Sequence, residues 1–225
     1  MNDMNQKALA PAMYESITDE VSDILCDIAE MGLDAIMDDA FLREIPFLST
    51  AVSLYRIGTS IRDRQYVKKL SAFILALNNG IVNDVQRKHY KAKVVDNPKR
   101  RNRELEYILI LIDRYLHSDK AQNLAKLYLC YLDERISWHD FSKFAEVLDR
   151  LMPGDYTELC TGIWENVNDT DVSDNLLRLV SLGLVVSHNQ GAKVDNTPGT
   201  LVFPDMTVKD YEITKFGRIF LECLS

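Results

Sequence analysis

Two apolar stretches separated by only four residues constrain the fold of this chain more than any other feature of its sequence. The first, Leu105–Leu116, reads LEYILILIDRYL, and the second, Ala121–Leu132, reads AQNLAKLYLCYL. Apolar stretches of this length are typical of buried helices rather than of strands. The intervening His117-Ser118-Asp119 is short enough for a turn between antiparallel neighbours. The pair therefore predicts a helical hairpin within a mainly α-helical fold.

Three further segments show helical periodicity. Apolar residues recur at intervals of three and four in residues 13–40, in Tyr66–Leu77 and in Phe141–Leu151, which predicts one long and two shorter amphipathic helices. Asn78-Asn79-Gly80 is a stop signal for the second helix, and Ser137 is suited to cap the third.

Two prolines mark predicted interruptions. Pro46 indicates a loop after the long helix, because proline disfavours helical backbone in the residue before it. Residues 81–104 are polar and basic and are interrupted at Pro98. Around Pro98, with Asn97 and Asn102 on either side, the composition suits an exposed loop or the entry to a helix more than a core element.

The periodicity changes after Met152-Pro153-Gly154-Asp155, which we interpret as a domain boundary. Before it we expect a helical bundle domain, residues 1–152, and after it a small α+β domain, residues 153–225. In the second domain we expect helices over 157–167 and 172–182, a strand at Leu184–Ser187, a loop over 189–200, a return strand at Lys209–Ile213 and a final helix capped by Thr214.

The strings LLRLVSLGLVV and YEITKFGRIFLECL resemble winged-helix domains. In those domains a third helix ends in Gly-Leu, a two-stranded wing follows, and a Y-x-[LI]-T-x-x-G motif opens the closing helix. Winged helices that read DNA carry basic and amide groups on the recognition helix. The corresponding segment here, DVSDNLLRLVSLG, begins with Asp171 and Asp174 and has Arg178 as its one basic residue. The resemblance therefore implies a winged helix that docks protein or is purely structural.

A second resemblance covers residues 20–155. The strings REIPFLSTAVSLYRIGTSIRDRQYVKKLSAF and DKAQNLAKLYLCYLDERISWHDFSKFAEVLDRL are similar to a family of uncharacterised bacterial helical proteins. This resemblance implies a helical fold and adds no chemistry.

Charge is distributed unevenly along the chain. The net charge is −9 over residues 1–50, +8 over 51–120 and −7 over 121–225, within a total of −8. An acidic total disfavours general nucleic-acid binding, but a basic segment over 87–103 can bind phosphate backbones or anionic lipid. The alternative is a solvated linker that pairs with the acidic N-terminal helix. The candidate anion-binding residues are Arg87, Lys88, Lys91, Lys93, Lys99, Arg100, Arg101 and Arg103.

Motifs of catalysis and of cofactor binding are missing from the sequence. It contains neither a G-x-S-x-G elbow nor a glycine-rich phosphate loop. Its four histidines are scattered and do not form H-E-x-x-H or E-x-x-H spacing, so we expect no catalytic residues, no metal and no cofactor. The opening MNDMNQKALA lacks the features of a secretory signal, and we expect a cytoplasmic protein.

The strongest membrane candidate is Ile45–Ile61, and it does not predict a transmembrane span. It is shorter than the roughly 20 residues that a spanning helix needs. Its Arg56 alone costs about 2.5–3.5 kcal/mol near the centre of a span. We expect a buried helix or hairpin here, and contact with a membrane surface remains open.

Together these observations favour a non-enzymatic protein-interaction module that binds another protein or a second copy of the chain. The alternative is a protein that binds an anionic surface, nucleic acid or acidic lipid, through residues 87–103. A third and weaker alternative is a defence protein that acts on membranes conditionally through Ile45–Ile61.

Overall fold

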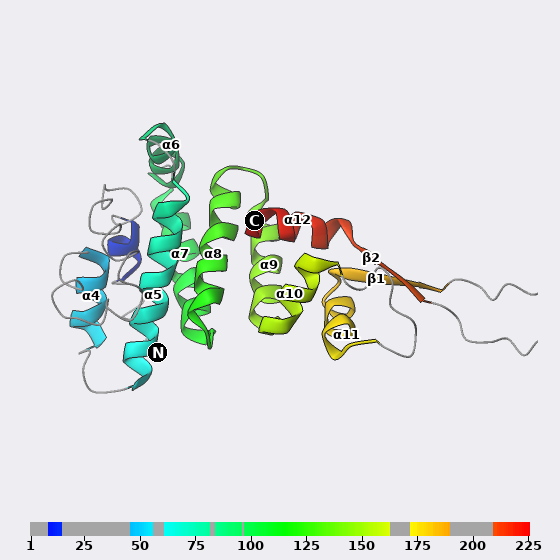
Figure 1. Ribbon diagram of the computed structural model, residues 1–225. Coiled ribbons are helices and arrows are strands. Elements are labelled where there is room, and N and C mark those ends of the chain that lie inside the picture. Colours follow the sequence, from blue (N-terminus) through cyan, green and yellow to red (C-terminus); the bar gives the residue numbers. More distant parts are fainter. Residues whose placement is uncertain are drawn as a thin grey trace, which may run out of the picture. The chain divides into compact units, whose positions relative to one another are not determined.

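The computed structural model describes residues 9–14, 46–55, 61–81, 84–95, 97–162, 172–189 and 209–225. The described residues are mainly helical, with one small two-stranded antiparallel sheet near the C-terminus, which confirms the predicted fold class at this level (Figure 1). The chain divides into two compact units, Met1–Asp149 and Arg150–Ser225. We expected a boundary between residues 152 and 153. Each unit is described by itself below.

The first unit is helical throughout its described part. Residues 9–14 form one helical segment, but most of the predicted 13–40 helix lies outside the described residues. The remaining helices are α4 Pro46–Tyr55, α5 Ile61–Asn79, α6 Asp84–Val95, α7 Pro98–Arg114, α8 Ser118–Leu132 and α9 Trp138–Arg150.

The predicted hairpin is confirmed as α7 and α8. Tyr131, near the end of α8, contacts Arg100 and Glu104, near the start of α7, so the two helices run antiparallel. The helix α5 packs chiefly against α8 and also lies against α7 (Figure 1). Side chains from all three helices, among them Phe73, Ile108 and Tyr128, are almost fully buried in this core.

A buried lysine fixes α5 to the end of α7. The ammonium of Lys69 donates to the carbonyl oxygens of Asp113 at 2.9 Å and Tyr115 at 2.6 Å. These carbonyls lie where a helix has no internal donors left, so the lysine satisfies groups that would otherwise be unpaired. Burial lowers the pKa of Lys69, and the neighbouring Asp113 carboxylate opposes that shift.

Several predicted helix ends are confirmed. Helix α5 ends at Asn79, within the Asn78-Asn79-Gly80 signal. The Ser137 hydroxyl accepts from the Asp140 amide at 3.1 Å, and the Asp140 carboxylate accepts from the Ser137 amide at 3.2 Å. This reciprocal arrangement is a capping box at the start of α9.

One prediction for the first unit is wrong, and one segment contains helices that were not predicted. Pro46 is the first residue of α4 rather than part of a loop, because a proline at the first helical position loses no hydrogen bond. The segment 81–104, for which no helix was predicted, contains α6 and the first turns of α7. At Asn97 the alternative of a helix entry is right, because its side chain accepts from the Arg100 amide at 3.1 Å and Pro98 follows it.

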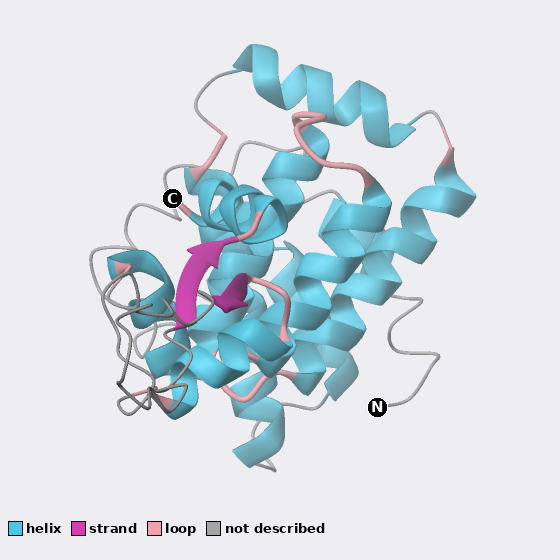
Figure 2. Cartoon of the chain, turned by 90° about the vertical axis from the view of Figure 1, so that its right-hand side faces the viewer, coloured by secondary structure: helices cyan, strands magenta, loops and turns pink. Residues whose placement is uncertain are grey.

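The second unit combines three helices and a hairpin. Its elements are α10 Pro153–Thr161, α11 Asp174–Ser181, β1 Val185–Asn189, β2 Lys209–Ile213 and α12 Lys215–Leu224. The strands pair antiparallel, with Val185 opposite Ile213 and Asn189 opposite Lys209, and Figure 2 shows them side by side.

The predicted helix over 157–167 is wrong in its bounds. It begins at Pro153 and ends at Thr161, where Gly162 adopts the left-handed conformation with φ 63°. Here too proline begins a helix instead of only separating segments. The return strand is confirmed, and the Thr214 hydroxyl caps α12 by accepting from the Gly217 amide at 2.9 Å.

Candidate functional site

The structure places the predicted anion-binding residues on two consecutive helices. Arg87, Lys88, Lys91 and Lys93 lie on α6, and Lys99, Arg100, Arg101 and Arg103 lie in the first two turns of α7. Among the side chains that the structure describes, Arg87, Arg100 and Arg101 contact other residues of the first unit, and Lys88, Lys99 and Arg103 are exposed.

Three arginines of this segment are engaged within the molecule. Arg87 donates to the Asn78 side chain at 3.3 Å. Arg100 donates to the Glu104 carboxylate at 2.7 Å and to the Tyr131 hydroxyl at 2.9 Å, and the hydrogen bond to Glu104 raises the pKa of Arg100. The guanidinium of Arg101 lies 4.4 Å from the centre of the Tyr14 ring, a cation–π contact.

These contacts have an electrostatic reason. Neither α5 nor α8 carries a basic residue in its own last turn, although the carboxyl end of a helix is partly negative. Arg87 lies beside Asn78 at the end of α5, and Arg100 lies beside Tyr131 at the end of α8. The basic segment thus supplies cations to two helix ends that lack their own.

The other described basic side chains of the segment face solvent. Lys88, Lys99 and Arg103 are exposed, and none of them forms an ion pair with any residue that the structure describes. Among the residues that the structure describes, the one hydrogen bond of this group is the donation from Arg103 Nε to the Lys99 carbonyl at 3.4 Å. These three side chains are therefore accessible to a ligand.

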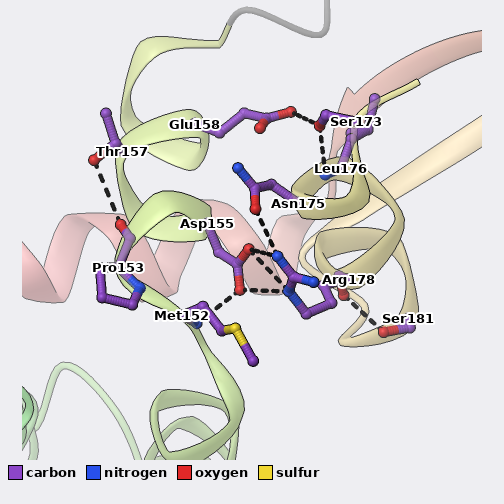
Figure 3. A network of polar contacts seen from close by, with 10 residues as sticks. All are labelled: Met152, Pro153, Asp155, Thr157, Glu158, Ser173, Asn175, Leu176, Arg178 and Ser181. Atoms are coloured by element: carbon purple, nitrogen blue, oxygen red, sulfur yellow. Dashed lines mark hydrogen bonds and ion pairs between the residues drawn. The ribbon is translucent and has the colours of Figure 1, made fainter. Parts of the chain in front are cut away.

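The second unit contains a polar network centred on one buried carboxylate (Figure 3). Asp155 on α10 is fully buried and accepts three hydrogen bonds from Arg178 on α11, at 2.8, 3.0 and 3.0 Å. It also accepts from the Met152 amide at 2.7 Å, which caps α10. Arg178 donates further to the Asn175 side chain at 2.6 Å.

A second pair extends this network along the same two helices. The Ser173 hydroxyl caps α11 by accepting from the Leu176 amide at 3.0 Å. The same hydroxyl donates to the Glu158 carboxylate at 2.6 Å. Figure 3 shows both contacts bridging α10 and α11. Side-chain contacts at two positions, Asp155 with Arg178 and Glu158 with Ser173, therefore fix the orientation of α11 on α10.

The outward side of α11 carries little positive charge. Asp174, Leu177 and Ser181 are exposed and follow one another at intervals of three and four residues, so they share a face. Leu177 is 56% exposed, a high value for a leucine in a packed helix. Sequence analysis identified the lack of basic residues but missed the exposure of Leu177 and the engagement of Arg178 by Asp155. A Pro at the first helical position followed by Asp two residues later is a signal that would have indicated the cap.

The part of the chain that the structure describes contains neither a candidate membrane span nor a candidate metal site. No helix there is long and apolar enough to cross a membrane, and within the stretch Ile45–Ile61 the helix α4 has ten residues. The described residues also contain no group of three or more His, Cys, Asp or Glu side chains placed to hold a metal ion.

Comparison with protein-family models, with curated proteins and with solved structures returned no match. The function is therefore inferred from the residues and contacts of the chain itself.

Proposed function

We propose that this chain is a non-enzymatic protein-interaction module, and that its partner docks on α11 of a winged-helix-like C-terminal domain. The order α10, α11, β1, β2, α12 supports the winged-helix-like interpretation. So does the left-handed Gly183, with φ 74°, between α11 and the hairpin. The function rests on what α11 offers to a partner.

The engagement of Arg178 carries this proposal. A winged helix that reads DNA needs basic or amide side chains free to reach bases and phosphates. The only basic residue of α11 is held by the buried Asp155 carboxylate and by Asn175. What remains outward on this helix is an acidic residue, a leucine and a serine, which disfavours a nucleic-acid phosphate as ligand.

Leu177 provides the kind of anchor that protein interfaces use. Interface energy concentrates in a few side chains that insert into a partner's pocket, surrounded by polar groups that exclude water. Leu177 lies between the polar residues Asp174 and Ser181 on the same face of the helix. The fitting partner is a protein that presents an apolar pocket beside a basic residue, and it is either a different protein or a second copy.

The experiment uses three versions of the full chain as affinity bait in lysate prepared from the source organism: the wild type, Leu177→Asp and Thr157→Asp. Leu177→Asp places a charge at the anchor, whereas Thr157→Asp adds the same charge to an exposed position of α10. Quantitative mass spectrometry should find one or a few proteins enriched by the wild type and by Thr157→Asp, and lost with Leu177→Asp. Light scattering tests self-association with the same three proteins. Equal recovery of every protein by all three baits, with a monomer in each case, would contradict the proposal.

A further inference from the structure

The amino end of α7 carries a surface that neither the core nor the proposed docking helix uses. We define the α7 basic patch as Lys99, Arg100 and Arg103. All three are exposed. Arg100 is paired with Glu104, with 61% of its side chain still accessible, whereas the part of the chain that the structure describes contains no acid paired with Lys99 or Arg103.

The positive charges of this patch lie near the amino end of α7, which is itself partly positive. The first turn of α7 contains no acidic residue and several basic ones. Because the amino end of a helix is partly positive, each uncompensated cation there is unfavourable. Glu104 compensates Arg100, and the guanidinium of Arg101 lies over the Tyr14 ring. Among the residues that the structure describes, no acid or aromatic ring compensates Lys99 in the first turn or Arg103 in the second. Local sequence choices that oppose stability are expected at functional sites.

The composition of the patch indicates the class of ligand. Protein interfaces are depleted of lysine and contain aromatic or aliphatic anchors, and a helix that lies on a lipid surface needs a broad apolar face. The exposed residues of the first two turns of α7 are Pro98, Lys99, Arg100 and Arg103, with no large apolar side chain among them. Binding of a phosphate backbone requires little besides positive charge.

We propose that the α7 basic patch binds the phosphate backbone of nucleic acid without reading its sequence. Lys99 and Arg103 lie about one helical turn apart on the same side of α7, about 6 Å along the axis, and Arg100 lies beside them. The patch belongs to the first unit and Leu177 to the second, so this proposal and the proposed function succeed or fail separately.

Counterion release gives the expected salt dependence. Three phosphate contacts predict a slope of about −2.7 for the logarithm of the binding constant against the logarithm of salt concentration with duplex DNA. Affinity should then fall about 40-fold between 50 and 200 mM salt. Because the whole chain carries a net charge of −8, binding is measurable chiefly at low ionic strength.

The experiment measures fluorescence anisotropy of a labelled mixed-sequence DNA duplex titrated with the full chain. Lys99→Ser with Arg103→Ser should lower the affinity at least tenfold at 50 mM salt and bring the slope to about −0.9. The matched control, Lys215→Ser with Arg218→Ser, removes the same charge from exposed positions of α12 and should bind with an affinity close to that of the wild type. The melting temperature of the first double variant should stay close to that of the wild type, because each exposed substitution usually changes stability by no more than about 0.5 kcal/mol.

Three results would overturn the proposal. These are no binding at 50 mM salt, an equal loss of affinity in both double variants, or binding to vesicles of acidic lipid without binding to DNA. If the serine variant folds poorly, the charge-preserving variant Lys99→Arg with Arg103→Lys decides the question. It should keep the affinity and slope of the wild type, and a loss of binding in that variant would also overturn the proposal.

Discussion

Replacing Asp155 with alanine should destabilise the second unit selectively. The carboxylate has no exposed surface, whereas the Arg178 side chain that it binds is 33% accessible. The substitution removes the cap on the Met152 amide and the three hydrogen bonds from Arg178.

The magnitude follows from these lost interactions. Loss of a helix cap costs about 0.5–2 kcal/mol, and a hydrogen bond to a charged group contributes about 1.5–3 kcal/mol. Arg178 can turn partly to solvent after its partner is removed, so the full cost of an unpaired buried charge does not apply. We expect Asp155→Ala to lower the free energy of unfolding by about 2–4 kcal/mol, which corresponds to a fall of at least about 8 °C in the melting temperature of a unit this small.

Hydrogen exchange read by mass spectrometry locates the effect. Peptides that cover α10 and α11 should exchange faster in Asp155→Ala, and peptides from α7 and α8 should exchange as in the wild type. Thr157→Ala, at an exposed position of the same helix, is the control and should stay within about 0.5 kcal/mol of the wild type. An Asp155→Ala protein as stable as that control would refute the assignment of Asp155 as the group that holds α11.

Three further predictions concern stability. Gly217→Ala should destabilise the chain by about 1–3 kcal/mol in a thermal melt, because a Cβ at this position would lie 2.2 Å from the Leu184 carbonyl oxygen, which belongs to backbone and cannot turn aside. Ser137→Ala should cost about 1 kcal/mol, and it should weaken the acid dependence of stability. The hydrogen bond from the Ser137 hydroxyl lowers the pKa of Asp140, so Asp140 stabilises the fold above its unfolded pKa and that contribution is lost as pH falls through the folded value. In urea unfolding, Ser137→Ala should therefore lose more stability relative to the wild type at pH 7 than at pH 3, and an equal loss at both pH values would contradict this. In alkali, burial raises the pKa of Tyr128, so stability should fall as pH rises above about 10, and tyrosinate absorbance of the folded chain should lag behind that of the urea-unfolded chain.

The local elements of the fold were largely predictable from the sequence. The apolar stretches at Leu105–Leu116 and Ala121–Leu132 became α7 and α8, and the strand Lys209–Ile213 was predicted with its observed bounds. Thr214 and Ser137 cap helices as their sequence positions indicated. These features depend on neighbours within one turn or one strand, which is the range that periodicity and capping rules describe.

The basic segment was predicted less well, for two physical reasons. In α6 few apolar residues reveal a helical period, and among the described side chains of that helix only Tyr90 is buried. The arginines that are engaged find partners far away in sequence, such as Tyr131 for Arg100, 31 residues distant. The sequence therefore identified eight candidate cations but could not separate those that stabilise the fold from Lys88, Lys99 and Arg103.

In the second unit, too, contacts between residues far apart in the sequence could not be predicted. Asp155 and Arg178 are 23 residues apart, and nothing local to either residue indicates the other. The lack of basic residues on α11 was predictable from composition, but the burial of Asp155 and the exposure of Leu177 depend on how the two helices pack.

The most direct measurement of the central proposal is the ratio of proteins recovered by the wild type and by Leu177→Asp in paired affinity purification, with Thr157→Asp as the control. Docking on α11 predicts that a small set of proteins, or the chain itself, is depleted at least tenfold by Leu177→Asp, since tenfold corresponds to the roughly 1.4 kcal/mol that a single anchor readily contributes. The control should recover the same set as the wild type. Identical recovery with all three baits, while Leu177→Asp remains folded by circular dichroism, would contradict docking through α11.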